Sequence, residues 1–96
     1  MYALIIDYIK SPQEVDNHMP AHLDWVKKHI AKKNLLLAGP KKCRLGGVII
    51  AKSMELNTLK EIIAEDPFYE KNLVDYRIID IDCLFTIKEL DFLKSA

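Results

Sequence analysis

The chain has 96 residues, of which 50% are hydrophobic, and its 14 basic and 14 acidic side chains give a formal net charge of zero. A chain of this length supports one modest hydrophobic core, so a single domain is expected. A neutral charge balance lacks the broad basic surface that nucleic-acid binding requires, which excludes nucleic acid as an expected partner.

A strand and a helix are predicted at the start of the chain. Residues 2–9 are largely apolar apart from Asp7 and end before a Ser-Pro pair, as is typical of a strand. Helical spacing of apolar residues predicts a helix over 18–33, with Asp16 or Asn17 expected to cap its first N–H groups. No basic segment precedes the first strand, and no apolar stretch reaches the ~20 residues that cross a bilayer. A cytoplasmic protein with no membrane partner is therefore expected.

Two further strands follow. Residues 35–38 predict the second strand, which Gly39-Pro40 is expected to end because proline cannot donate a hydrogen bond to a strand ladder. Residues 41–47 are expected to form a loop, and residues 48–52 the third strand.

A second helix over 54–65 and a fourth strand over 76–87 complete the pattern. The order strand-helix-strand-strand-helix-strand predicts an α+β, ferredoxin-like fold, in which one antiparallel sheet carries both helices on one face. The domain is expected to span residues 1–87, with residues 88–96 forming a tail or a short helix.

The predicted strands carry apolar residues on both faces. In the first strand Leu4 and Ile6 point to one face, while Ala3 and Ile5 point to the other. The helices can cover only one face, and a bare apolar face of this size is rare on a soluble monomer. A homodimer formed through the sheet faces is therefore expected.

The predicted topology brings three separated motifs to one end of the sheet. Strands one and two run in one direction and strands three and four run back, so the first helix starts where the second strand ends and the second helix finishes. His22, Gly39-Pro40 and Asp66-Pro67-Phe68 should therefore meet there. The sequence predicts one pocket built from these motifs.

Four short strings stand out by their order and spacing. They are Pro20-Ala21-His22-Leu23, Leu35-Leu36-Leu37-Ala38-Gly39-Pro40, Gly46-Gly47-Val48-Ile49-Ile50-Ala51 and Asp66-Pro67-Phe68. Together they resemble the YCII-related family of small bacterial proteins over residues 1–87. The resemblance implies a dimeric α/β barrel, with His22 as the histidine of the family's proposed active site and Asp66 as its acidic partner. The chain departs from the family pattern at Lys33-Asn34, which replaces a frequent glycine, and Asn34 is expected to take the left-handed conformation there.

His22 and Asp66 each also have a structural interpretation. On the first helix Leu23, Val26 and Ile30 are expected to form the buried stripe, with His22 at its boundary as a packing residue. An aspartate before proline commonly caps a turn. In the catalytic interpretation, Asp66 accepts the N–H of His22 and leaves the other ring nitrogen to act as general base or acid.

Several neighbours are expected to bind the substrate. Gly39, Pro40 and Phe68 are predicted to line the pocket, with Tyr69 extending its apolar wall. Arg44, in the loop beside the pocket, is either a solvated loop residue or a group that attracts an anionic substrate, and it is taken as a candidate substrate-binding residue. The other basic side chains that could do so, or could simply be solvated, are Lys41, Lys42 and Arg77.

A zinc site is weighed and disfavoured. His18 and His22 stand four residues apart and could share a metal, but no HExxH pattern is present, and His29 lies ~16 Å from His18 along a helix. No metal and no other cofactor is expected, and His18 and His29 are expected at the surface. Cys43 and Cys83 are expected to stay reduced, Cys43 in a loop and Cys83 in the core.

These features favour a cofactor-independent enzyme of lyase or isomerase type, in which His22 and Asp66 move a proton on a small anionic or aromatic metabolite. Proteins with a similar dimeric barrel include muconolactone isomerase-like proteins, and one branch resembling the family is linked to dehalogenation. The alternative is a noncatalytic small-molecule-binding or accessory homodimer, and a third hypothesis is a purely structural dimer.

Overall fold

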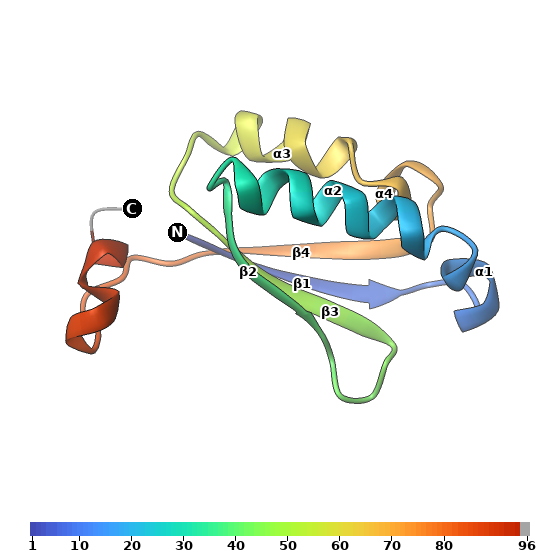
Figure 1. Cartoon of the computed structure of the whole chain (residues 1–96), viewed down its shortest axis with the longest axis horizontal. Coiled ribbons are helices and arrows are strands. Elements are labelled where there is room, and N and C mark those ends of the chain that lie inside the picture. The colour runs from blue at the N-terminus through green and yellow to red at the C-terminus, as the bar shows by residue number, and fades with distance from the viewer. Residues whose placement is uncertain (95–96) are drawn as a thin grey trace.

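The computed structural model of the protein describes residues 1–94 as one four-stranded sheet with helices against one of its faces (Figure 1). In chain order the elements are β1 (Tyr2–Tyr8), α1 (Pro12–Asp16), α2 (Met19–Ala31), β2 (Leu35–Pro40), β3 (Gly46–Ala51), α3 (Leu56–Ala64), α4 (Pro67–Glu70), β4 (Val74–Asp80) and a terminal 3-10 helix, η1 (Lys88–Lys94). The predicted α+β, ferredoxin-like fold is confirmed. No helix within residues 1–94 has the length and apolar character needed to cross a bilayer.

All strand pairs are antiparallel, in the spatial order β2-β3-β1-β4. Leu4 of β1 lies between Ile49 of β3 and Ile78 of β4, while β2 pairs with β3 at the margin of the sheet. β1 and β2 therefore run in the same direction and finish at the end of the sheet where β3 and β4 begin. These are the strand directions that the sequence predicted.

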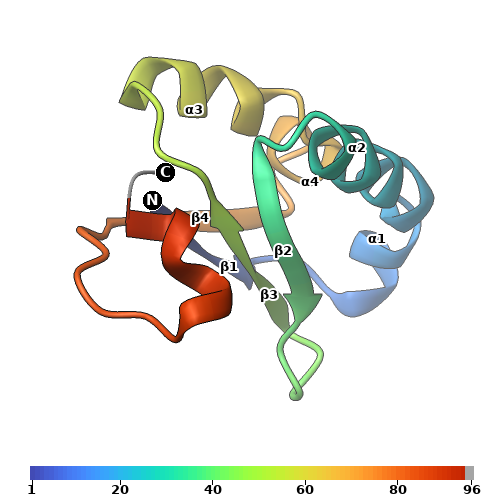
Figure 2. The ribbon, with the colours of Figure 1, turned by 60° about the vertical axis from the view of Figure 1, so that its left-hand side comes forward.

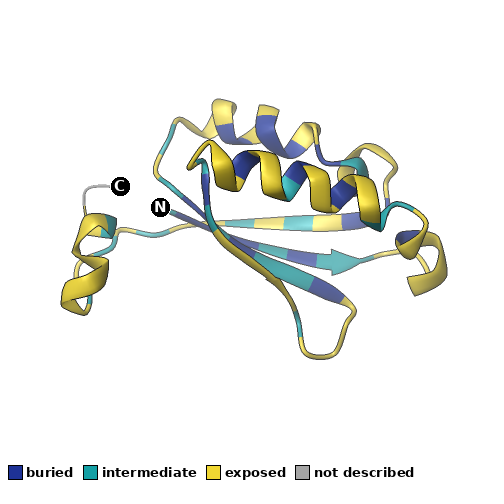
Figure 3. Cartoon of the chain, in the orientation of Figure 1, coloured by how far each residue is buried: buried dark blue, intermediate teal, exposed yellow. Residues whose placement is uncertain are grey.

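The hydrophobic core fills the space between the helices and one face of the sheet (Figure 3). Leu4, Leu35, Leu59 and Phe68, which come from four different elements, are at most 2% exposed. Burial of each such side chain stabilises the fold by about 1.5–3 kcal/mol. The opposite face of the sheet carries none of the α-helices of residues 1–94 (Figures 1 and 2).

β2 and β3 extend further toward their connection than predicted. β2 continues through Pro40, which lies in register with Gly47, and β3 begins at Gly46. The expectation that Gly39-Pro40 ends the strand was wrong. Proline is tolerated here because β2 has a neighbouring strand on one side only.

The two ends of α2 also differ from the prediction. His18 occupies the N-cap position and its side chain makes no capping hydrogen bond, so the expected capping by Asp16 or Asn17 was wrong. Both residues instead belong to the end of the unpredicted α1. Beyond the helix, Lys33 takes the left-handed conformation, with φ of 62°, that was expected of Asn34.

The fourth strand is shorter than predicted at its far end, because β4 stops at Asp80. Residues 82–87 pair with no strand in the described part of the chain, and Phe85 among them is 92% exposed. Cys83 is half-buried and lies outside the core, whereas Cys43 is exposed in a loop as expected. η1 follows, and residues 95 and 96 of the predicted tail lie outside the described residues.

Two glycines of the β2–β3 hairpin offer a matched test of the fold. A Cβ at Gly46 would collide with the backbone carbonyl of Ile6, whereas a Cβ at Gly39 would meet nothing within 4 Å. We expect Gly46→Ala to lower the free energy of unfolding by at least about 2 kcal/mol, and Gly39→Ala to change it by less than about 0.5 kcal/mol. Urea unfolding of both variants measures the difference, and equal stabilities would contradict the tight β1–β3 approach.

Candidate active site

The site is built around a hydrogen bond between His22 of α2 and Asp66, the residue that precedes α4. The Nδ1 atom of His22 lies 2.7 Å from Oδ1 of Asp66, although the two residues are 44 positions apart in the sequence. His22 is 9% exposed and Asp66 is fully buried. The structure therefore brings together the two residues predicted to form a pair.

Asp66 is held by two further donors. Its Oδ1 accepts the backbone N–H of Phe68 at 3.0 Å, which caps α4, and its Oδ2 accepts the hydroxyl of Tyr76 at 2.6 Å. Because a carboxylate can only accept, the hydrogen-bond network assigns the donated proton to Nδ1 of His22. The second ring nitrogen, Nε2, is then the one that can accept a proton from a ligand.

The orientation of the imidazole is fixed by aromatic neighbours as well. The rings of His22 and Phe68 stack with centroids 3.9 Å apart and an interplanar angle of 2°. The ring of Trp25, one turn further along α2, has its centroid 5.7 Å from that of the same imidazole. A ring packed on its face and bonded at Nδ1 is oriented before any ligand arrives, which is the arrangement that a general base requires.

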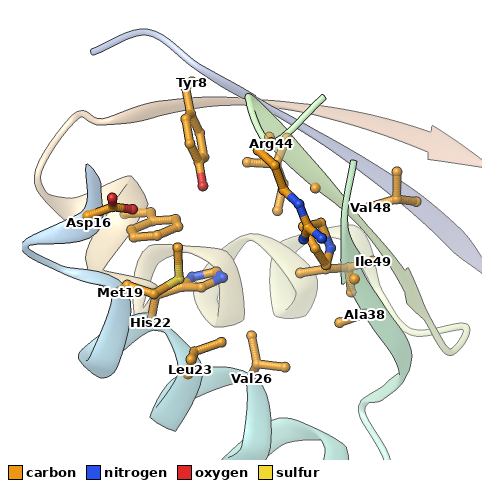
Figure 4. Close-up of a pocket in the computed structure, with 16 residues that line it drawn as sticks. Tyr8, Asp16, Met19, His22, Leu23, Val26, Ala38, Arg44, Val48 and Ile49 are labelled. Atoms are coloured by element: carbon orange, nitrogen blue, oxygen red, sulfur yellow. The ribbon is translucent and has the colours of Figure 1, made fainter. Parts of the chain in front are cut away.

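A cavity of about 390 Å³ lies beside this pair, between α2 and the β2–β3 hairpin (Figure 4). This is within the usual size range of small-molecule sites. Of the residues predicted for the site, five line the cavity: His22, Gly39, Pro40, Arg44 and Phe68. Asp66 is buried and does not line it. The other lining residues are Ile6, Tyr8, Asp16, Met19, Leu23, Val26, Ala38, Gly46, Gly47, Val48 and Ile49.

The buried face of α2 differs from the predicted one. His22, Trp25 and His29 are buried, whereas Leu23 and Ile30 are 44% and 38% exposed. The expected stripe was wrong because each buried ring has a polar partner outside its own helix: Trp25 donates to the carbonyl of Ile62, and the histidines face carboxylates. Leu23 lines the cavity instead of the core.

His29 was expected at the surface and is only 2% exposed. Its Nε2 lies 3.0 Å from Oε1 of Glu65, and its Nδ1 lies 3.1 Å from the side-chain nitrogen of Asn34. Hydrogen bonds from His29 and then Lys28 lower the pKa of Glu65. These contacts join the end of α2 to the end of α3 and leave His29 away from the cavity.

The other residues suggested by the sequence lie outside the cavity lining. Lys41 donates to Asp7, which also faces Arg77 at 3.7 Å, and these contacts lower the pKa of Asp7, the hydrogen bond from Lys41 most of all. Lys42 and Tyr69 are exposed. Arg44 is thus the basic side chain of this group that reaches the cavity.

Two tyrosines were missed by the sequence analysis. Tyr8 lines the cavity, and Tyr76 supports Asp66. The alternation of side chains along a strand could have placed both tyrosines on the face toward the helices. Tyr8 continues the buried face of Leu4 and Ile6, and Tyr76 shares a face with Val74. Tyr8 is the last residue of β1 and Tyr76 lies near the start of β4, and these are the strand ends where the predicted motifs meet.

Burial raises the pKa of the Tyr76 hydroxyl well above its ordinary value, and the charge of Asp66 and the hydrogen bond to it raise it further. A pKa that is higher in the folded than in the unfolded chain adds stability that is complete below about pH 10 and is lost as the pH rises further. Tyr76 therefore stays a hydrogen-bond donor to Asp66 throughout the neutral range.

We expect Tyr76→Phe to be less stable than the unmodified chain by about 1.5–3 kcal/mol at pH 8, since it loses a hydrogen bond to a buried carboxylate. The deficit should shrink above about pH 10, because only the unmodified chain then loses the Tyr76 contribution. Urea unfolding between these pH values measures both effects. The exposed Tyr69, changed to Phe, is the control, and a deficit that does not depend on pH would contradict the assignment.

Among residues 1–94, no three or more His, Cys, Asp or Glu side chains are grouped so as to hold a metal ion. The two buried histidines of α2 contact two different carboxylates, His22 that of Asp66 and His29 that of Glu65. Hydrogen bonds to Asp66 and stacking on Phe68 position the imidazole of His22.

A family model for the YCII-related domain matches residues 1–82. The chain belongs to the YCII-related domain family. A solved structure with the same fold is that of 5-chloro-2-hydroxyhydroquinone dehydrochlorinase from Burkholderia phenoliruptrix AC1100, in complex with 2,5-dihydroxybenzoquinone. It matches this YCII-related domain with a TM-score of 0.70 and 19% sequence identity, over 84% of this chain and 93% of that chain. No curated protein matches the sequence at a significant level.

Proposed function

We propose that this YCII-related domain is a small-molecule enzyme of lyase or isomerase type, in which His22 transfers a proton without the help of a cofactor. The observation that carries the proposal is the 2.7 Å contact between Nδ1 of His22 and a fully buried carboxylate, at the wall of a cavity of about 390 Å³. This is the geometry of an oriented general base.

In the proposed step, Nε2 of His22 takes a proton from the bound substrate. The ring becomes an imidazolium, whose charge the Asp66 carboxylate stabilises while Tyr76 and the N–H of Phe68 hold that carboxylate in place. In an isomerisation, the proton returns to a different atom of the substrate. In an elimination, the electron pair of the broken bond expels a leaving group, and Nε2 later releases its proton to water.

The structural neighbour supports the choice of reaction class and of test compounds. That protein is a dehydrochlorinase, solved in complex with 2,5-dihydroxybenzoquinone, and a dehydrochlorinase is a lyase. We therefore propose hydroxylated one-ring compounds, hydroxyquinones and their halogenated precursors among them, as the first substrates to screen. The shared fold does not by itself transfer a substrate.

Deuterium exchange tests the proposal without knowledge of the product. The purified protein is incubated with the compounds in D₂O, and NMR follows the replacement of carbon-bound protons and the appearance of new species. Protein-dependent exchange or turnover of any compound is the expected result. Binding without exchange would instead support a noncatalytic binding protein, and neither binding nor exchange would leave a structural protein.

We also propose that two copies of the chain pair through the uncovered faces of their sheets. This face carries apolar side chains that are partly or largely exposed, of which Leu37 is 55% and Ile79 is 47% exposed. Stacking two such faces would remove them from water, at about 25 cal/mol per Å² of apolar surface. Light scattering should give twice the 11.1 kDa chain mass, and Leu37→Glu should shift the protein to the monomer; a monomeric unmodified chain would refute this pairing.

A further inference from the structure

The wall of the cavity carries polar groups besides His22, and Tyr8 is the first of them. Its hydroxyl points into the cavity (Figure 4), while its ring meets Phe68 edge-on with centroids 6.1 Å apart. Within residues 1–94 the hydroxyl makes no hydrogen bond. Burial, and secondarily the charge of Asp16, raises the pKa of Tyr8, so the group remains a neutral phenol with a proton to donate.

Arg44 is the second group. It lies in the β2–β3 connection and lines the cavity. In contrast to Lys41 and Arg77, which both face Asp7, the Arg44 guanidinium forms no ion pair among the described residues. Five N–H donors in a planar fork are thus available to an acceptor in the cavity.

Asp16 makes the two sides of the cavity differ in charge. It lines the side formed by α1 and α2, and Figure 4 shows it across the cavity from Arg44, with Tyr8 between them. Apolar side chains, such as those of Met19, Val26 and Ile49, form most of the remaining wall (Figure 4). An anion is therefore favoured near Arg44 and disfavoured near Asp16, where a hydroxyl group can donate instead.

We propose that this cavity selects a small acid with an apolar body, whose anionic group binds Arg44 and whose hydroxyl group lies against Tyr8 and Asp16. Tyr8 and Arg44 are then specificity-determining residues. This inference rests on the proposed function only in using the same cavity, and it concerns which compounds bind rather than whether a proton moves.

Three probes of nearly equal size separate the two contacts: 4-hydroxybenzoate, benzoate and 4-hydroxybenzamide. Binding is measured by calorimetry and by the fluorescence of Trp25, which is the single tryptophan of the chain and lies 5.7 Å from His22. We expect the hydroxybenzoate to bind at least about tenfold more tightly than the neutral amide, as a hydrogen-bonded charge would provide. The 2- and 3-hydroxybenzoates are added to the set. They place the hydroxyl at other distances from the carboxylate, and we expect the isomer whose spacing matches the two contacts to bind most tightly.

Each contact has a matched pair of variants. Arg44→Gln should abolish the preference for the acid over the amide, whereas Lys42→Gln removes the same charge from the same loop outside the cavity and should leave the preference intact. Tyr8→Phe should weaken the preference for hydroxybenzoate over benzoate, leaving only the contact with Asp16, whereas Tyr69→Phe, outside the cavity, should not change it. Circular dichroism checks that each variant is folded.

Three results would overturn the inference: equal effects of Arg44→Gln and Lys42→Gln, an amide that binds as tightly as the acid, or no binding of any probe at millimolar concentration. Selective binding without deuterium exchange of any compound would refute the proposed enzyme and leave this inference standing. Deuterium exchange whose rate and substrate preference are unchanged in Arg44→Gln and Tyr8→Phe would support the proposed enzyme and refute this inference.

Discussion

His22→Gln is expected to slow the proton transfer by about 10²–10⁴-fold, the usual contribution of a general acid or base. Glutamine can still donate an N–H toward Asp66, so the buried carboxylate keeps a partner. It has no nitrogen that takes a proton near neutral pH, so the proposed reaction would lose its base. The rate of deuterium exchange, measured on the compound that the unmodified protein processes, reports this loss.

His18→Gln is the matched control for this experiment. His18 lies four residues earlier, is only partly buried and does not line the cavity, so the same substitution there should leave the exchange rate unchanged. The emission of the buried Trp25 verifies that both variants are folded. A His22→Gln protein that is folded and exchanges at the unmodified rate would exclude His22 as the base.

Asp66→Ala is expected to have the largest effect on stability, a loss of about 3–5 kcal/mol in the free energy of unfolding. Three donors would lose their acceptor in a region from which water is excluded: the Nδ1–H of His22, the backbone N–H of Phe68 and the hydroxyl of Tyr76. Since small domains are stable by only about 5–15 kcal/mol, this one change removes a large share of the stability. Urea unfolding followed by Trp25 fluorescence measures the loss.

Two companion variants identify its cause. Asp24→Ala, on the exposed side of α2, should change stability by less than about 0.5 kcal/mol. Asp66→Asn keeps an oxygen that can cap α4 but loses the charge, so its stability should lie between those of the alanine variant and the unmodified chain. An Asp66→Ala protein as stable as the Asp24→Ala control would show that the carboxylate is not a structural centre.

The order of the main elements could be predicted because it depends on local periodicity, and the meeting of His22 with Asp66 followed from that order. The short helices α1 and α4 could not be found this way, since segments of 5 and 4 residues carry too little of a helical period. The end of β4 was missed for another reason. Alternating apolar residues continue past Asp80, but the described chain supplies no strand to pair with them.

The buried face of α2 shows the limit of reading burial from hydrophobicity. His22 and His29 are buried because Asp66 and Glu65, respectively, accept hydrogen bonds from them, and those partners lie 44 and 36 residues away. A helical wheel contains no information about such partners. It therefore placed Leu23 in the core, whereas the structure leaves this leucine 44% exposed beside the cavity.

One oxygen of Asp66 serves both the fold and the proposed site. Oδ1 caps α4 through Phe68 and also orients His22. A relative that lacked the proposed reaction would still need the aspartate in order to fold, and we expect it to keep the Asp-Pro-Phe string. We expect folding alone to constrain position 22 less, because glutamine there can also donate an N–H toward Asp66. In a comparison of relatives, we therefore expect the residue at position 22, and not the aspartate, to separate chains that retain the chemistry from those that retain only the fold.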